Sequence, residues 1–189
     1  MRIAILALQG AFEEHQKMLD SLGVESFLIR KLSDWQQPKD GLILPGGEST
    51  AMLRIMNDEG LLEPIQKEIN DGLAVFGTCA GMILLAKEVE NDSRNRLATM
   101  DITVLRNAYG RQLGSFFVNE NFKGIGEVPM TFIRAPYITK AKENVEILSS
   151  HDGHIIAARQ GKQLAISFHP ELNEDKRIHE YFLKMVKGE

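Results

Sequence analysis

Short apolar runs alternate with helical patterns through the first half of the chain, and this alternation narrows the folds that the chain can adopt. The apolar runs cover residues 3–8, 24–29, 41–44 and 73–76. The pattern between and after them predicts helices over residues 12–22, 49–56, 61–70 and 80–87. Strands that alternate with helices are typical of βαβ units, so we expect a parallel sheet in this half.

The second half has a different pattern, in which short strands follow one another through turns. The strand candidates are residues 102–105, 115–118, 130–133, 145–148, 154–158 and 164–168. This spacing predicts a mixed or antiparallel extension of the sheet, and an amphipathic helix over 178–186 closes the chain. The sequence contains no internal repeat, low-complexity tract or linker, so we expect one domain over residues 1–189.

Composition limits the partners and the compartment. The 22 Lys and Arg against 26 Asp and Glu give a formal net charge of −4 without a dense basic run, which argues against a nucleic-acid partner. No segment approaches the roughly 20 apolar residues of a membrane span, and the run at 3–8 is too short for a signal peptide. The sequence also offers no convincing cluster of metal ligands. We therefore expect a cytoplasmic protein whose single cysteine stays reduced.

That single cysteine, Cys79, lies in the stretch GTCAG between Gly77 and Gly81. The stretch has the G-x-nucleophile-x-G form of a nucleophile elbow, in which a strand turns abruptly into a helix and presents one side chain to a cleft. Glycines suit such a turn because it leaves no room for Cβ atoms. The alternative is a buried structural cysteine that packs as a small hydrophobe, and the fragment alone leaves both interpretations open.

A thiol nucleophile needs a base, because the free thiol with a pKa of about 8.5 is largely protonated at neutral pH. Of the five histidines, His169 stands apart in SFHPEL, at the end of an apolar strand and two residues before Glu171. Glu171 could hold the imidazole in one orientation, which is the third role in a triad. A strand-end histidine with an unrelated surface glutamate is the alternative. Both Cys79 and His169 follow predicted strands, whose carboxyl ends form the ligand crevice in open α/β sheets, and this favours catalysis.

Acyl transfer also needs donors for the developing oxyanion. The amide of Ala80, at the start of a predicted helix, is one natural donor. The segment LPGGEST offers the second, because Gly47 lets the backbone approach a substrate closely. The alternative is a simple strand-to-helix turn in which Ser49 and Thr50 cap the helix. Beside a Cys-His-Glu set, an oxyanion hole formed by Gly47 and Ala80 is the better interpretation.

GTCAG with a distant HPE resembles the class I glutamine amidotransferases, which hydrolyse glutamine with a Cys-His-Glu triad. The motifs LQGAFEEH, LPGGEST, RNAYGRQ and SFHPEL, in this order, resemble more narrowly the glutaminase subunits of pyridoxal 5′-phosphate synthases. The resemblance covers nearly the whole chain. It implies a three-layer, flavodoxin-like α/β fold whose mixed sheet has a parallel core and an antiparallel extension. It also implies that L-glutamine is converted to L-glutamate and ammonia through a thioester.

The resemblance can be carried over residue by residue. It implies that Cys79 is the nucleophile, that His169 is the base and acid, and that Glu171 orients it. The implied substrate contacts are Gly47, Glu48, Ser49, Arg106, Ile133 and Arg134. Glutamine carries an α-carboxylate and an α-ammonium group, so its site needs a cation and an acceptor. Without the resemblance, the two arginines would be interpreted as solvated surface charges.

The same resemblance implies a partner. In this family ammonia passes to a separate synthase subunit, which builds the cofactor from a pentose phosphate and a triose phosphate in a hetero-oligomeric complex. Pyridoxal phosphate is thus a product of the assembly, and we expect no cofactor in this chain. Residues 9–15 are implied as contacts through which docking raises activity. Alternatively, this is an ordinary helix with Phe12 and Leu19 in the core and Glu13 in solvent.

Three other functions remain as alternatives. A glutaminase of another pathway, such as imidazole glycerol phosphate or aminodeoxychorismate synthesis, is disfavoured by GGEST and RNAYGRQ. A cysteine hydrolase or stress protein of the elbow type would not need the H-x-E pair after the last strand. A catalytically silent binding module is disfavoured because all three residues of a triad are present.

Overall fold

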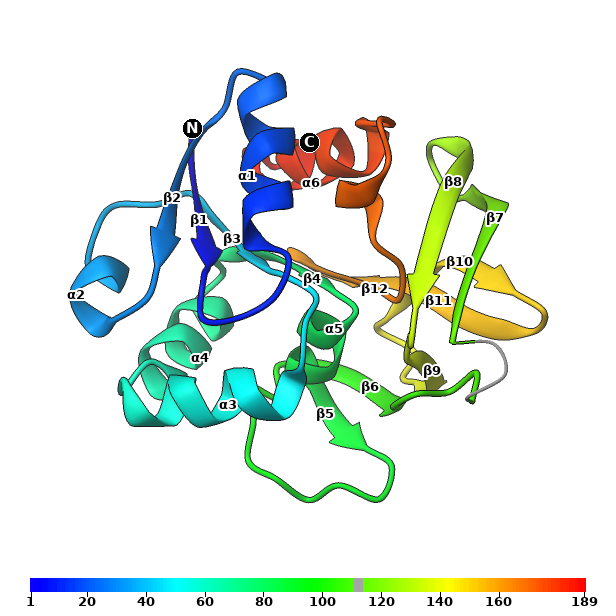
Figure 1. Ribbon diagram of the computed structural model, residues 1–189, viewed down its shortest axis with the longest axis horizontal. Coiled ribbons are helices and arrows are strands. Elements are labelled where there is room, and N and C mark those ends of the chain that lie inside the picture. Colours follow the sequence, from blue (N-terminus) through cyan, green and yellow to red (C-terminus); the bar gives the residue numbers. More distant parts are fainter. Residues whose placement is uncertain (111–113) are drawn as a thin grey trace.

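Helices cover both faces of a ten-stranded sheet in the computed structural model, which describes residues 1–110 and 114–189 (Figure 1). One half of the sheet is parallel. In spatial order it contains β2 (Glu25–Ile29), β1 (Arg2–Leu6), β3 (Gly41–Leu44), β4 (Ala74–Thr78) and β12 (Gln163–Ile166). The last strand of the chain therefore lies beside β4, in the middle of the sheet.

The other half of the sheet is mixed. Beyond β12 it continues through β11 (His154–Gln160), β9 (Tyr137–Ala141), β6 (Met100–Leu105) and β5 (Ala86–Val89), and β10 (Glu146–His151) also pairs with β11. The pairs of β11 with β12, β9 and β10, and of β9 with β6, are antiparallel. The predicted parallel core with an antiparallel extension is confirmed.

The helices form the two outer layers (Figure 1). On one face lie α1 (Phe12–Ser21) and α6 (Arg177–Lys187), and on the other lie α3 (Ser49–Asp58), α4 (Leu62–Asn70) and α5 (Ala80–Leu85). The short α2 (Leu32–Trp35) follows β2 at the edge of the sheet. Alternate residues of β1 serve the two faces, because successive strand side chains point to opposite sides. Ala4 and Leu6 pack in one core cluster, and Ile3 and Ile5 in the other.

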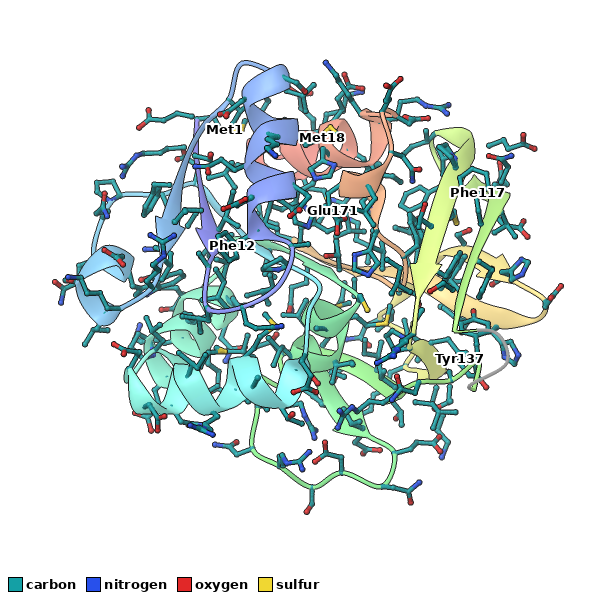
Figure 2. The ribbon with its side chains drawn as sticks, viewed as in Figure 1. Met1, Phe12, Met18, Phe117, Tyr137 and Glu171 are labelled. Carbon is teal, nitrogen blue, oxygen red and sulfur yellow. The ribbon has the colours of Figure 1, made fainter. Side chains whose placement is uncertain are left out.

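Three predicted elements differ from the structure. The helix expected over 80–87 ends at Leu85, and Ala86–Val89 instead forms β5 at the sheet edge. The segments around 115–118 and 130–133 form a separate two-stranded sheet, β7 (Ser115–Phe122) with β8 (Gly126–Ile133), rather than part of the main one. The hairpin buries one face of each strand, including Phe122 and Phe132, and leaves Phe117 on its outer side (Figure 2).

No helix within the described ranges is long and apolar enough to cross a membrane.

Candidate active site

The turn between β4 and α5 has the geometry of a nucleophile elbow. Cys79 connects the strand to the helix with φ of 51° and ψ of −101°, a conformation that residues with a side chain rarely adopt. Its N–H donates a 2.8 Å hydrogen bond to the carbonyl oxygen of Ile166 in β12, which holds the elbow against the neighbouring strand. A Cβ atom at Gly77 would lie 2.7 Å from the backbone of Gly81, so the tight turn explains the glycine.

His169 and Glu171 follow β12, the strand that lies next to β4. The backbone N–H of His169 donates to the carbonyl oxygen of Thr131 at 2.8 Å. Its ring Nδ1 lies 2.6 Å from Oε1 of Glu171, which belongs to the 3-10 turn η1 (Pro170–Leu172). Both side chains are buried, and Figure 2 shows Glu171 in the interior beside α1. The carboxylate of Glu171 therefore holds the imidazole of His169 in one orientation.

His169 and Cys79 line the same cavity, and Cys79 is close enough to change the pKa of His169. Burial by itself lowers the pKa of His169, but the hydrogen bonds with Cys79 and Glu171 and the charges of these two groups outweigh it and raise the pKa to about 10. With Nδ1 occupied by Glu171, the ring offers Nε2 to the sulfur. The three residues therefore form a connected line from carboxylate to imidazole to thiol.

A cavity of about 350 Å³ opens in front of Cys79 and His169. All six residues predicted as substrate contacts line it: Gly47, Glu48, Ser49, Arg106, Ile133 and Arg134. Glu171 and Ala80 do not reach the wall; Glu171 lies behind His169, and Ala80 is buried in the first turn of α5. The carbonyl oxygen of Ile133 is 3.9 Å from Sγ of Cys79. The cavity thus brings the reactive groups and the predicted contacts together.

The cavity wall carries opposite charges. Arg106 lies 3.3 Å from Glu48 and 3.3 Å from Asp92, so two carboxylates hold its guanidinium group in place. Partial burial raises the pKa of Glu48, but hydrogen bonds from Thr50 and Ala51 and the charge of Arg106 lower it overall. Glu48 is also the N-cap of α3, since its side chain accepts a 2.8 Å hydrogen bond from the N–H of Ala51. The prediction that Ser49 and Thr50 supply this cap is wrong.

The N-terminal loop holds the glycine-containing segment 46–48. The N–H of Ala11 donates to the carbonyl oxygen of Gly46 at 2.9 Å, and the N–H of Glu48 donates to Oε1 of Gln9 at 2.7 Å. Gly10 has φ of +91°, and a Cβ atom there would collide with the carbonyl oxygen of Gly46. The orientations of the peptide groups next to Gly47 are therefore set by residues 9–11.

Several residues of the site were missed by sequence reasoning. Gln9, Ile83 and Asn107 also line the cavity, and Asn107 could have been found because it follows Arg106 in RNAYGRQ. Arg111 and Gln112 of this motif lie outside the described residues. His15 and His179 are fully buried on the side of Glu171 away from the cavity. Positions 12, 15, 19 and 22 lie on the apolar face of the predicted helix, and this spacing could have indicated that His15 is buried.

Among the described residues, no group of three or more His, Cys, Asp or Glu side chains is arranged to hold a metal ion. The chemical resources of the site are a thiol, an imidazole, a carboxylate and backbone amides. These groups suit acyl transfer with a covalent intermediate.

Comparison with known proteins gives a consistent set of relatives. The model of the SNO glutamine amidotransferase family matches residues 5–188. A protein of Streptococcus pneumoniae named pyridoxal 5′-phosphate synthase subunit PdxT is 55% identical over 190 residues, which cover 99% of this chain and 98% of the relative. A protein of the same name from Methanocorpusculum labreanum is 57% identical over 188 residues, covering 100% and 99%.

Solved structures show the same fold. A crystal structure described as a glutamine amidotransferase superposes with a TM-score of 0.93 at 42% identity and covers 98% of both chains. A putative GMP synthase protein from Thermoplasma acidophilum gives a TM-score of 0.71 at 17% identity, covering 100% of this chain and 94% of the other. The second similarity extends the fold, and only the fold, to more distant proteins.

Proposed function

Because the chain belongs to the SNO glutamine amidotransferase family, it is a glutaminase, and we propose that Cys79, His169 and Glu171 form its catalytic triad. One observation carries this assignment. His169 is held by Glu171 at 2.6 Å on one ring nitrogen and lies with Cys79 at the wall of a cavity that suits a small polar substrate. The substrate is L-glutamine, and the products are L-glutamate and ammonia.

The reaction proceeds in two halves. His169, whose pKa is raised to about 10, carries the proton that Cys79 gives up, and Sγ attacks the carboxamide carbon of glutamine to form a tetrahedral oxyanion. When this intermediate collapses, the C–N bond breaks, the imidazolium protonates the leaving nitrogen, and ammonia departs from a γ-glutamyl thioester. His169 then removes a proton from water, whose oxygen displaces the sulfur to give glutamate. Glu171 keeps the ring in one tautomer and stabilises the imidazolium in both halves.

Two backbone amides are proposed to stabilise the oxyanion. The N–H of Ala80 follows the nucleophile directly and lies at the N-terminus of α5, where the helix dipole favours negative charge. The N–H of Gly47 comes from a residue that lines the cavity. A properly placed donor contributes roughly 10²- to 10³-fold in rate.

The remaining cavity residues are proposed to recognise the amino-acid end of glutamine. Arg106 and Arg134 supply positive charge for the α-carboxylate, and Glu48 supplies an acceptor for the α-ammonium group. Ser49 and Ile133 complete the wall. Arg134 has φ of 45°, a left-handed backbone conformation for a residue with a side chain, and such strain is common where a side chain must be aimed at a ligand.

The ammonia is proposed to pass to a synthase subunit. Both named relatives are subunits of a pyridoxal 5′-phosphate synthase and match this chain over almost their entire length. We therefore assign the chain to vitamin B6 biosynthesis in a hetero-oligomeric complex, acting in the cytoplasm as a single glutaminase domain over residues 1–189. A single free thiol suits such a reducing compartment.

The test measures glutamate and ammonia released from glutamine, with and without a pyridoxal 5′-phosphate synthase subunit. Glutamine hydrolysis, together with formation of pyridoxal phosphate from a pentose phosphate and a triose phosphate in the mixture, is the expected result. Hydrolysis without product transfer to this synthase would assign the chain to another amidotransferase. Absence of hydrolysis under both conditions would contradict the triad.

A further inference from the structure

A line of buried polar side chains continues beyond Glu171, away from the glutamine cavity. Oε2 of Glu171 lies 3.6 Å from Nε2 of His15, in α1. The other ring nitrogen of His15, Nδ1, is 2.9 Å from Nε2 of His179, in α6. Both imidazoles are completely buried. Nε2 of His15 also lies 3.2 Å from the hydroxyl oxygen of Thr78, the residue before Cys79. These contacts therefore join four elements, α1, α6, β4 and η1, on the side of Glu171 away from the cavity.

Both imidazoles are neutral. Burial, followed by the positive charge that His179 and His169 would carry, lowers the pKa of His15 well below its usual value. Burial likewise lowers the pKa of His179 to about 3. A neutral imidazole has one N–H donor and one acceptor nitrogen, so the contact between the two rings permits only two arrangements of protons.

In the first arrangement, Nδ1–H of His15 donates to His179. The bare Nε2 of His15 would then face the carboxylate oxygen of Glu171, lone pair against negative charge, and His179 would keep its proton on Nδ1. That atom is buried without a hydrogen-bond partner, as is Oε2 of Glu171. A buried N–H without an acceptor is rare in proteins, so this arrangement is unfavourable on two counts.

In the second arrangement, Nε2–H of His179 donates to Nδ1 of His15. His15 then carries its proton on Nε2, where it donates to the hydroxyl oxygen of Thr78 and directs its positive end toward Oε2 of Glu171. The atom left without a partner is the Nδ1 lone pair of His179, which costs less than a buried N–H. The carboxylate of Glu171 then has an N–H group facing each of its oxygens.

We propose that His15 is a positioning residue of the glutaminase, whose Nε2–H holds the carboxylate of Glu171 in the plane that His169 requires and whose tautomer is set by His179. This proposal rests on the proposed function. Glu171 lies in a turn of only three residues, whereas His15 belongs to a ten-residue helix packed on the sheet. The longer helix α1 can therefore hold the carboxylate of Glu171 in place. Rotation of this carboxylate would break its 2.6 Å contact with Nδ1 of His169.

The experiment compares two substitutions of His15, measured in the complex with the synthase subunit. His15→Leu fills the space and removes the N–H, while His15→Gln can place an amide N–H near the position of Nε2. At 3.6 Å the N–H of His15 faces the carboxylate without a full hydrogen bond, so its loss should correspond to roughly 3- to 10-fold in rate. We expect His15→Leu to lower kcat by about that factor with KM for glutamine unchanged, because His15 does not line the cavity. His15→Gln should recover most of kcat.

Leu19→Ala is the matched control, because it removes buried packing from the same helix without touching the triad. We expect it to lower stability and leave kcat within about twofold of the parent. Equal losses of kcat in His15→Leu and His15→Gln, or a comparable loss in Leu19→Ala, would overturn the proposal, since helix packing alone would then explain the effect.

A measurement on the unmodified protein covers the case in which His15→Leu does not fold. Ring ¹⁵N resonances of histidine-labelled complex should show His15 as the neutral Nε2–H tautomer, and an Nδ1–H tautomer would overturn the proposal. This measurement also separates the two hypotheses. An unmodified complex that releases no glutamate would refute the proposed function, whereas an active complex with the wrong His15 tautomer would refute only the role of His15.

Discussion

Oε1 of Gln9 accepts a 2.7 Å hydrogen bond from the backbone N–H of Glu48, 39 residues further along the chain. Together with the bond from Ala11 to Gly46, it ties the N-terminal loop to both sides of Gly47. The loop leads directly into α1, whose Glu13 is exposed. A partner that contacts this region can therefore change the orientation of the amide proposed as an oxyanion donor.

We predict that the synthase subunit raises glutaminase turnover by up to roughly 10²- to 10³-fold, the value of one oxyanion donor. Gln9→Ala should weaken this response, because it frees the peptide between Gly47 and Glu48. Steady-state glutamate formation across a titration of synthase measures the effect, with Lys31→Ala, an exposed residue elsewhere, as control. A flat titration despite binding shown independently would mean that the oxyanion hole is preformed.

Substitution of Cys79 should separate activity from stability. Cys79→Ala and Cys79→Gly both remove the only thiol, so we expect no glutamine hydrolysis from either. Cys79→Gly should be about 1 kcal/mol more stable than Cys79→Ala, because glycine adopts φ of 51° without the strain that alanine retains. Denaturant unfolding measures the difference. Residual hydrolysis in a preparation free of contaminating glutaminase would exclude Cys79 as the nucleophile.

The two partners of Cys79 should differ in severity. His169→Ala removes the base and should abolish turnover, whereas Glu171→Gln should leave part of it, since His169 remains but is less well oriented and its imidazolium less stabilised. Turnover at saturating glutamine gives the comparison, and circular dichroism shows that both variants are folded. The reverse order of severity would mean that the two roles are misassigned.

Arg106→Ala should raise KM for glutamine by roughly 10- to 100-fold with a smaller change in kcat, because it removes the charge-assisted hydrogen bond proposed for the α-carboxylate. Arg94→Ala is the matched control: Arg94 contacts the same Asp92 at 2.9 Å but does not line the cavity. Equal effects of the two substitutions on KM would point to Asp92, and not to substrate contact, as the cause.

Stability should fall as the pH is lowered from about 6.5 to 5. Burial lowers the pKa of His15 well below the ordinary histidine value and brings the pKa of His179 to about 3. In this range the unfolded chain binds protons that the folded chain does not, so each imidazole contributes a slope of about 1.4 kcal/mol per pH unit. Urea unfolding across the range measures the total slope. His179→Gln should reduce it by one imidazole's share, and an unchanged slope would contradict a neutral buried His179.

Above pH 6.5, His169 makes the stability fall as the pH rises, the opposite of the effect of His15 and His179 below it. Its pKa is raised to about 10 in the folded protein, so the stability that it gains from Cys79 and Glu171 is fully present below 6.5 and is lost as the pH rises through 10. The three histidines together therefore place the highest stability near pH 6.5.

The parallel half of the fold could be predicted because its signals are local. Each strand of this half is a short apolar run, and the predicted strand 41–44 coincides with β3. The edge strand β5 was missed because AKEV places two exposed charged residues between the buried Ala86 and Val89, a spacing of three that continues the pattern of the preceding helix. The strands β7 and β8 were predicted, but their separation from the main sheet was not, because strand patterns carry no information on which sheet a strand joins.

The candidate site likewise has a part that the sequence predicts and a part that it does not. Cys79, His169 and Glu171 occur in compact motifs, and the structure brings them together. The N-cap role of Glu48 depends on the direction of its side chain, which the neighbouring candidates Ser49 and Thr50 do not reveal in the sequence. The contact between His15 and His179 joins residues 164 positions apart and depends on how α1 and α6 pack side by side on the sheet (Figure 1).

The position of β12 has a consequence for synthesis of the protein on the ribosome. Until residues 163–166 emerge, the edge of β4 that they cover has no partner, and unpaired strand edges promote aggregation. His169 and Glu171 follow on the same segment. The nascent chain therefore acquires its proposed base in the same step that covers the edge of β4, so on this assignment an incomplete chain with an unpaired strand edge carries a thiol without its base.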